Sequence, residues 1–254
     1  MARYQLTLAY DGADFFGSQR QASPTGARKR TVQGELENAL CQLEWTGRSV
    51  IMAGRTDTGV HATGQVASFD LDWPHSDEDL VRALNALLPA DMAVHRAQLA
   101  HAKFHPRFDA SARRYRYRLF CQPLRHPLRE RFAWRVWPPI SGEILSETAQ
   151  LFLGTHDFSA FGSPTTPNGG TVRTVMKAEW SQAEEDGTWQ FDVQADAFLY
   201  RMVRRLVFAQ VAAAQGKVSA ETISRLLAKQ ESAEKFPAGL APAHGLTLVE
   251  VTYA

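Results

Sequence analysis

The arrangement of the first half of this chain depends on residues 53–66, which read AGRTDTGVHATGQV. An apolar run at 50–53 precedes this stretch, and a run that alternates between apolar and polar residues follows it from residue 66, as in strands. We therefore predict a tight loop between two strands, with Asp57 between Gly54 and Gly59. Glycine accepts positive backbone angles and close approach of a ligand, so this carboxylate can face a substrate.

The residues of this loop also fit three other interpretations. Asp-Thr-Gly is also ordinary turn chemistry, because Asp side chains bond their own backbone in turns. Gly54 and Gly59 fit the first half of a phosphate loop, but Val60 and His61 stand where Lys and Ser/Thr are needed. An aspartic protease needs a second carboxylate loop, and the sequence holds no second copy.

The residues around this loop predict two α+β halves. In the first half, the expected order is β-α-β-β-α-β, a ferredoxin-like unit, with strands at 3–10, 48–53, 64–70 and 92–99 and helices at 32–45 and 77–88. Thr31 and Ser76 are the expected N-caps of these helices. The second half has a similar order but more strands, at 112–121, 131–137, 171–181, 188–195 and 246–253, with helices at 142–153, 198–215 and after Ser219. We place the boundary near 100–111, which gives an N-terminal domain of 1–105 and a C-terminal domain of 106–254.

Composition is that of a soluble globular protein, with 44% hydrophobic and 22% charged residues. No apolar run is long enough to span a membrane, and the N-terminus does not resemble a signal peptide. Cys41 and Cys121 are therefore expected to be buried free thiols in a reducing cytoplasm. A zinc site is not expected, because there is no C-x-x-C and Pro106 disfavours a helix that would align His101 with His105.

A net charge of +1 hides a strongly basic segment. Residues 101–135 hold ten Lys/Arg and two acids, interleaved with aromatic residues. Because arginines pair with phosphates and bases stack on aromatic rings, this pattern predicts a nucleic-acid-binding surface; a solvated basic face is the alternative.

Six blocks of sequence resemble the tRNA pseudouridine synthase A family, in the family's order and from end to end of the chain. They are 53–66, 10–12 with 17–21, 104–108, 112–117, 198–204 and 245–249. The resemblance implies the pseudouridine synthase fold, with two ferredoxin-like or RRM-like halves whose antiparallel sheets join around a basic cleft. It also implies a homodimer that binds tRNA across both subunits and isomerises uridine to pseudouridine at positions 38, 39 and 40 of the anticodon stem-loop. No cofactor, metal or nucleotide is implied.

The resemblance also implies roles for individual residues. Asp57 would be the nucleophile, Arg204 its ion-pair partner, and Tyr115 would stack on the uracil and relay the C5 proton. Arg55 would fill the stack left by the flipped base, Leu246 would form an apolar wall and His61 would support the loop. Further substrate contacts would come from Gln19, Arg20, Arg107, Arg113, Arg114, Arg173 and Arg201. By pattern alone, Arg204 fits better as a solvent-facing helix residue, which together with Arg201 and Arg205 would bind phosphate. Tyr115 also fits as a strand core residue, and pattern does not separate the wall role of Leu246 from an ordinary core role.

The chain departs from the family pattern at Ser18, Thr58, Arg201, Arg205 and Phe208. The family commonly has Trp, Ala, His, Asn and Gly there, and none of these positions is a proposed catalytic residue. Phe208 in place of Gly implies altered packing of the long helix.

Two competing functions remain open. A non-catalytic RNA-binding module would bind tRNA without changing it, although the RRM aromatic signature is absent. A glycosidase-type hydrolase using Asp57 would need a second acid and would release uracil.

Overall fold

The computed structural model describes residues 1–21, 29–166, 169–229 and 236–253. The chain divides into two compact units, Met1–Ser111 with Thr247–Ala254, and Ala112–Leu246. This division differs from the predicted one at 105/106, above all because the last residues return to the first unit. The mixed α+β class and the antiparallel sheets are confirmed.

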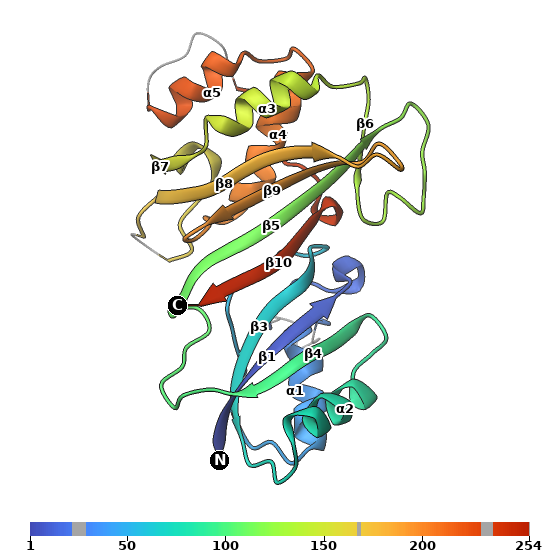
Figure 1. Cartoon of the computed structure of the whole chain (residues 1–254), viewed down its shortest axis with the longest axis vertical. Helices are drawn as coiled ribbons and strands as arrows, with labels where there is room; N and C mark the ends of the chain where they lie inside the picture. Colours follow the sequence, from blue (N-terminus) through green and yellow to red (C-terminus); the bar gives the residue numbers. More distant parts are fainter. Residues whose placement is uncertain (22–28, 167–168, 230–235, 254) are drawn as a thin grey trace. The chain divides into compact units, whose positions relative to one another are not determined.

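The first unit has the predicted β-α-β-β-α-β order (Figure 1). Strand β1 (Ala2–Tyr10) lies between β3 (His61–Leu71) and β4 (Met92–Leu99), antiparallel to both. The short β2 (Ile51–Met52) pairs antiparallel with β3, and β10 (Leu246–Tyr253) pairs parallel with β3 at Thr247 and Leu248. Two α-helices, α1 (Val32–Gln42) and α2 (Asp77–Leu87), complete the order. The 3₁₀ turn η1 (Gly12–Asp14) follows β1 directly.

Both helices of the first unit begin where the capping residues predicted. Thr31 accepts a hydrogen bond from the Gly34 N–H, and Ser76 forms a capping box with Asp79. The expectation that both thiols are buried is wrong, because Cys41 is exposed and Cys121 is half-buried. Ala39 and Leu40 face the core, and the helical repeat of 3.6 residues carries the next side chain out toward solvent.

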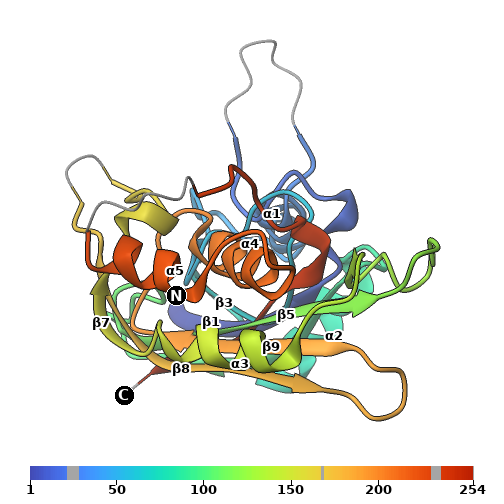
Figure 2. The same ribbon diagram turned by 90° about the horizontal axis from the view of Figure 1, so that it is seen from above.

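The second unit is built on β5 (Ala110–Cys121), β9 (Trp189–Ala195), β8 (Val172–Gln182) and β7 (Gly154–Asp157), each antiparallel to the next, with the short β6 (Trp134–Val136) parallel to β5. Its helices are α3 (Gly142–Gln150), α4 (Met202–Ala214) and α5 (Ala220–Leu227), with 3₁₀ turns η2 (Ser159–Phe161) and η3 (Ala243–Gly245). Figure 2 shows α4 on one side of β5, β9 and β8. The buried alternate residues of β5, Tyr115, Tyr117 and Leu119, belong to the core of this unit.

Two elements of the second unit differ from expectation. The helix predicted from residue 198 begins only at Met202. Arg201 has a left-handed backbone (φ 62°), which a right-handed helix cannot include. Strand β7 was not expected; its four residues, Gly-Thr-His-Asp, carry no alternating apolar pattern.

Candidate active site

The loop Gly54–Val60, referred to below as the Asp57 loop, has the tight turn that its glycines predict. The Val60 N–H donates to the Asp57 carbonyl oxygen at 3.1 Å, and Gly59 has a φ of 79° at the third turn position. A residue other than glycine is strained at that angle. Asp57 is half-buried, whereas Arg55 and Thr58 are exposed.

The residue before Asp57 is held by the segment that follows β1. The Thr56 N–H donates to Ser18 Oγ at 2.8 Å, and the Ser18 N–H donates to the Thr56 carbonyl at 3.1 Å. The hydroxyls of Thr56 and Tyr10 lie 2.9 Å apart. Ser18, where the family commonly has Trp, is thus a buried part of the loop's support.

His61 ties the far end of the loop to η1. Its ring is buried, and Nδ1 lies 3.0 Å from both the Gly12 nitrogen and Asp11 Oδ1. Gly12 also packs on Val60 so closely that a Cβ there would lie 2.0 Å from the Val60 carbonyl oxygen. The supporting role of His61 stays a prediction, and these are the contacts that it would use.

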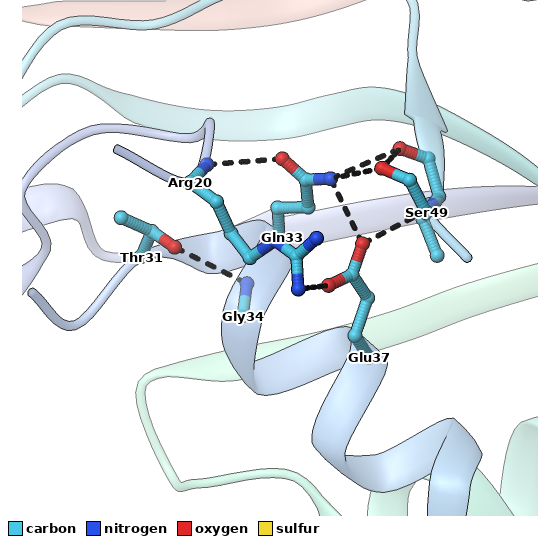
Figure 3. A network of polar contacts seen from close by, with 7 residues as sticks. Arg20, Thr31, Gln33, Gly34, Glu37 and Ser49 are labelled. Atoms are coloured by element: carbon cyan, nitrogen blue, oxygen red, sulfur yellow. Dashed lines mark hydrogen bonds and ion pairs between the residues drawn. The ribbon is translucent and has the colours of Figure 1, made fainter. Parts of the chain in front are cut away.

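Gln33 and Glu37, both buried on α1, form a polar network with Arg20 and Ser49 (Figure 3). The Glu37 carboxylate accepts from Gln33 Nε2 at 2.8 Å and from the Val50 N–H at 3.0 Å. It also pairs with Arg20 Nη1 at 2.8 Å. Arg20, a predicted substrate contact, is therefore already ion-paired to a buried carboxylate, although half of its side chain is exposed. Its neighbour Gln19 is exposed.

In the second unit, Tyr115 and Arg204 are both held in place. The Tyr115 side chain is 8% exposed and its ring meets that of Phe198 edge-on at 5.1 Å. Arg204, in the first turn of α4, donates from Nε to the Ala241 carbonyl at 2.7 Å, and the Ala241 N–H donates back to the Arg204 carbonyl at 3.3 Å. The next residue, Pro242, accepts from the Tyr117 hydroxyl at 2.9 Å. The segment that leads to the buried Leu246 is thus fastened to both α4 and β5.

Phe208 lies one helical turn after Arg204, on the same face of α4, and packs on this segment too. A Cβ on Gly239 would lie 2.0 to 2.5 Å from three atoms of the Phe208 ring. The altered packing expected at Phe208 is therefore a direct contact between its ring and a glycine backbone.

This contact predicts that Gly239→Ala destabilises the second unit by about 1–3 kcal/mol, since the ring must move. In the double variant with Phe208→Ala, the total loss should fall below the sum of the two single losses by about 1–2 kcal/mol. Urea unfolding of both singles and the double measures this. Gly170→Ala is the matched control, because no atom lies within 4 Å of its added Cβ. Strictly additive losses would contradict the contact.

The basic segment is partly neutralised by acids that lie outside it in sequence. Arg116 forms a bidentate pair with Asp192 at 3.1 and 2.9 Å, and Arg114 Nη1 lies 3.9 Å from the same carboxylate. Asp192 stands directly opposite Arg116 in the β5–β9 register. Arg129 pairs likewise with Asp186 at 3.4 Å. The count over 101–135 therefore overstated the charge available to a nucleic acid.

The remaining predicted contacts differ in how firmly they are held. Arg113 donates to the Asp196 carbonyl at 2.8 Å, and Arg173 donates to the Gly170 carbonyl at 3.1 Å. The Arg201 guanidinium lies 4.7 Å from the centre of the Tyr200 ring and is exposed, and Arg107 is half-buried beside Phe108.

Asp57, Arg55 and His61 belong to the first unit, and Tyr115, Arg204 and Leu246 to the second. Their meeting at one site, and the Asp57–Arg204 pair in particular, stay predictions. Within the described ranges, no helix is long and apolar enough to cross a membrane, and no group of His, Cys, Asp or Glu side chains is arranged to hold a metal ion.

A family model described as tRNA pseudouridine synthase matches residues 7–109 and 148–254. Proteins named tRNA pseudouridine synthase A are similar over the whole chain. That of Solidesulfovibrio magneticus is 42% identical over 262 residues, covering 100% of this chain and 92% of the relative. Those of Limosilactobacillus fermentum and Neisseria meningitidis serogroup B are each 38% identical, covering 100% and 99% of this chain and 96% and 92% of the relatives. Among solved structures, a chain from the crystal structure of a Cbf5-Nop10-Gar1 complex has a TM-score of 0.39 at 12% identity, covering 82% of this chain and 44% of that one.

Proposed function

Since the chain belongs to the tRNA pseudouridine synthase family, we propose that it isomerises uridines 38, 39 and 40 in the anticodon stem-loop of tRNA, with Asp57 as nucleophile. The conversion of uridine to pseudouridine in tRNA is the family's reaction, so the protein is an isomerase. The observation that carries the assignment of Asp57 is the half-buried carboxylate on a glycine-bounded turn, in a chain that matches the family from end to end.

The chemistry needs one carboxylate and no external reagent. The bond from C1′ to N1 of uracil breaks, the base rotates, and C1′ joins C5; C5 then loses its proton and N1 gains one. Asp57 serves either by attacking C1′ or by assisting loss of a 2′ proton, and both routes use the same oxygen atoms. The uracil is retained, so no second carboxylate is required.

The other proposed residues act around that carboxylate. Arg204 pairs with Asp57 and orients its carboxylate, while Tyr115 stacks on the uracil and relays the C5 proton. The target base must leave its stack, and Arg55, exposed on the Asp57 loop, fills the space. Leu246 forms the apolar wall. The buried, edge-on packing of Tyr115 supports this role, since a rigid ring gives a defined stacking surface.

We further propose a cytoplasmic homodimer, each tRNA touching both subunits, as the family resemblance implies. Light scattering of the protein with and without tRNA tests the dimer, and a monomer in both would exclude it.

Tritium release from tRNA labelled with 5-³H-uridine tests the proposed function. We expect release from a tRNA with uridines at 38–40 and none from the same tRNA with cytidines there. Tight binding without release would instead support the RNA-binding module, and free uracil would support the hydrolase.

Salt dependence of tRNA binding tests the proposed phosphate contacts. Arg201→Gln should weaken binding and lower the slope of log K against log salt by about 1, because one fewer phosphate is neutralised. Arg82→Gln is the matched control, since Arg82 is exposed on α2 beside Asp79. If the slope of log K against log salt is the same for Arg201→Gln and wild type, Arg201 does not contact a tRNA phosphate.

A further inference from the structure

Every polar group of Thr56, the residue before Asp57, is hydrogen-bonded to the segment Tyr10–Ser18. Its N–H donates to Ser18 Oγ at 2.8 Å and its carbonyl accepts from the Ser18 N–H at 3.1 Å. Its hydroxyl lies 2.9 Å from the Tyr10 hydroxyl. Three hydrogen bonds to Tyr10 and Ser18 thus hold the backbone and the side chain of the residue that precedes Asp57.

All three partners are removed from water. Tyr10 is 4% exposed, Ser18 1% and Thr56 7%. A buried donor or acceptor that loses its partner leaves an unsatisfied group that costs about 1–3 kcal/mol. The loop therefore has one favoured position rather than several of similar energy.

The Tyr10 hydroxyl also links the two sides of the loop. Gln65, fully buried in β3, donates from Nε2 to the Gly54 carbonyl at 2.9 Å and to the Tyr10 hydroxyl at 3.4 Å. The Tyr10 oxygen accepts from Gln65, and either hydroxyl can be the donor in the bond between Tyr10 and Thr56. Burial raises the pKa of Tyr10 to about 12, so the Tyr10 hydroxyl keeps its proton throughout the neutral range.

Ser18 in turn is anchored to α1. The Gln33 N–H donates to the Ser18 carbonyl at 2.9 Å. The Gln33 side chain accepts from the Arg20 N–H at 2.9 Å (Figure 3). The same side chain donates to the buried Glu37 at 2.8 Å. The support is therefore continuous from the helix to Thr56.

We propose that Tyr10, Ser18 and Thr56 are positioning residues, which hold the Asp57 carboxylate in its reactive place through the backbone of Thr56. The inference rests on the proposed function of Asp57. A displacement of a reacting group by about 1 Å can cost about 10²-fold in rate. Because the three side chains are buried, their loss should lower kcat and leave KM for tRNA unchanged.

Variants that remove one hydroxyl each provide the test. We expect Tyr10→Phe and Thr56→Val to lower kcat about 10- to 100-fold, with KM within about twofold of wild type. Thr56→Ser, which keeps the hydroxyl, should recover most of kcat. The double variant Tyr10→Phe/Thr56→Val should be no slower than the slower single, since both remove one shared bond; multiplied losses would overturn the proposal.

Two further measurements separate positioning from general destabilisation. Tyr4→Phe is the matched control, because Tyr4 is equally buried on β1 but faces Phe69, and its kcat should stay within about twofold. Amide hydrogen exchange of residues 54–60 should quicken in Thr56→Val but not in Tyr4→Phe. Unchanged exchange would overturn the positioning role alone, whereas absence of tritium release by the wild type would overturn the proposed function alone.

Discussion

Asp57→Asn is expected to lower turnover of uridine by at least about 10⁴-fold, as removal of a catalytic nucleophile does in other enzymes. The amide has nearly the same size and shape as the carboxylate but can neither attack C1′ nor accept a 2′ proton. Asp57 is only half-buried, so the fold should persist, with a change in unfolding free energy within about 1 kcal/mol. Tritium release measures turnover, and filter binding of the same tRNA measures affinity.

The control is the same substitution at a carboxylate outside the site. Asp72 is exposed beyond the end of β3, and Asp72→Asn should release tritium at the wild-type rate. Turnover retained in Asp57→Asn would remove Asp57 from the chemistry. Loss of both turnover and tRNA binding in Asp57→Asn would instead assign Asp57 to binding.

Gly12→Ala is the second substitution with a large expected effect. The added Cβ would lie 2.0 Å from the oxygen, 2.5 Å from the carbon and 3.0 Å from the nitrogen of Val60, all backbone atoms that no rotamer change can move aside. Val60 closes the turn that begins at Asp57, so the loop itself must shift. We expect a loss of about 3 kcal/mol or more in unfolding free energy and a fall of about 10²-fold or more in kcat.

Thermal unfolding and tritium release on one preparation check this result. Gly170→Ala is again the matched control, since its added Cβ meets no atom within 4 Å and its backbone is not in the left-handed region. If Gly12→Ala keeps the wild-type unfolding free energy and kcat, the loop can move aside with no loss of stability or activity. That result would contradict the close contact between Gly12 and Val60.

Local signals in the sequence predicted most elements of both units. Thr31 and Ser76 marked the starts of α1 and α2 because an N-cap acts within one helical turn. The hairpin between β8 and β9 turns near Asp186 as expected, with Gly187 at a φ of 66°. Such features depend on residues a few positions apart, and a single sequence contains them.

Contacts between distant residues were not predictable in the same way. Periodicity marks β10 as a strand but does not say that it pairs with β3, where Thr247 lies opposite His61, 186 positions earlier in the chain. The same holds for Asp192, which neutralises Arg116 only because their strands lie in register. The support of Thr56 by Tyr10 and Ser18 was missed for the same reason: the resemblance marked the blocks that hold these residues, but only the structure shows that their side chains meet.

The pairing of β10 with β3 has a consequence for the order of folding during synthesis. Residues 247–254 leave the ribosome after the whole of 112–246, so the first unit completes its sheet only after the second unit has been made. Until then, the edge of β3 at His61, next to the Asp57 loop, lacks its parallel neighbour. Such a non-local contact forms slowly because a long loop must close first. The strand that completes the sheet beside the Asp57 loop is thus synthesised after the whole of the second unit, and this part of the first unit is expected to form late in folding.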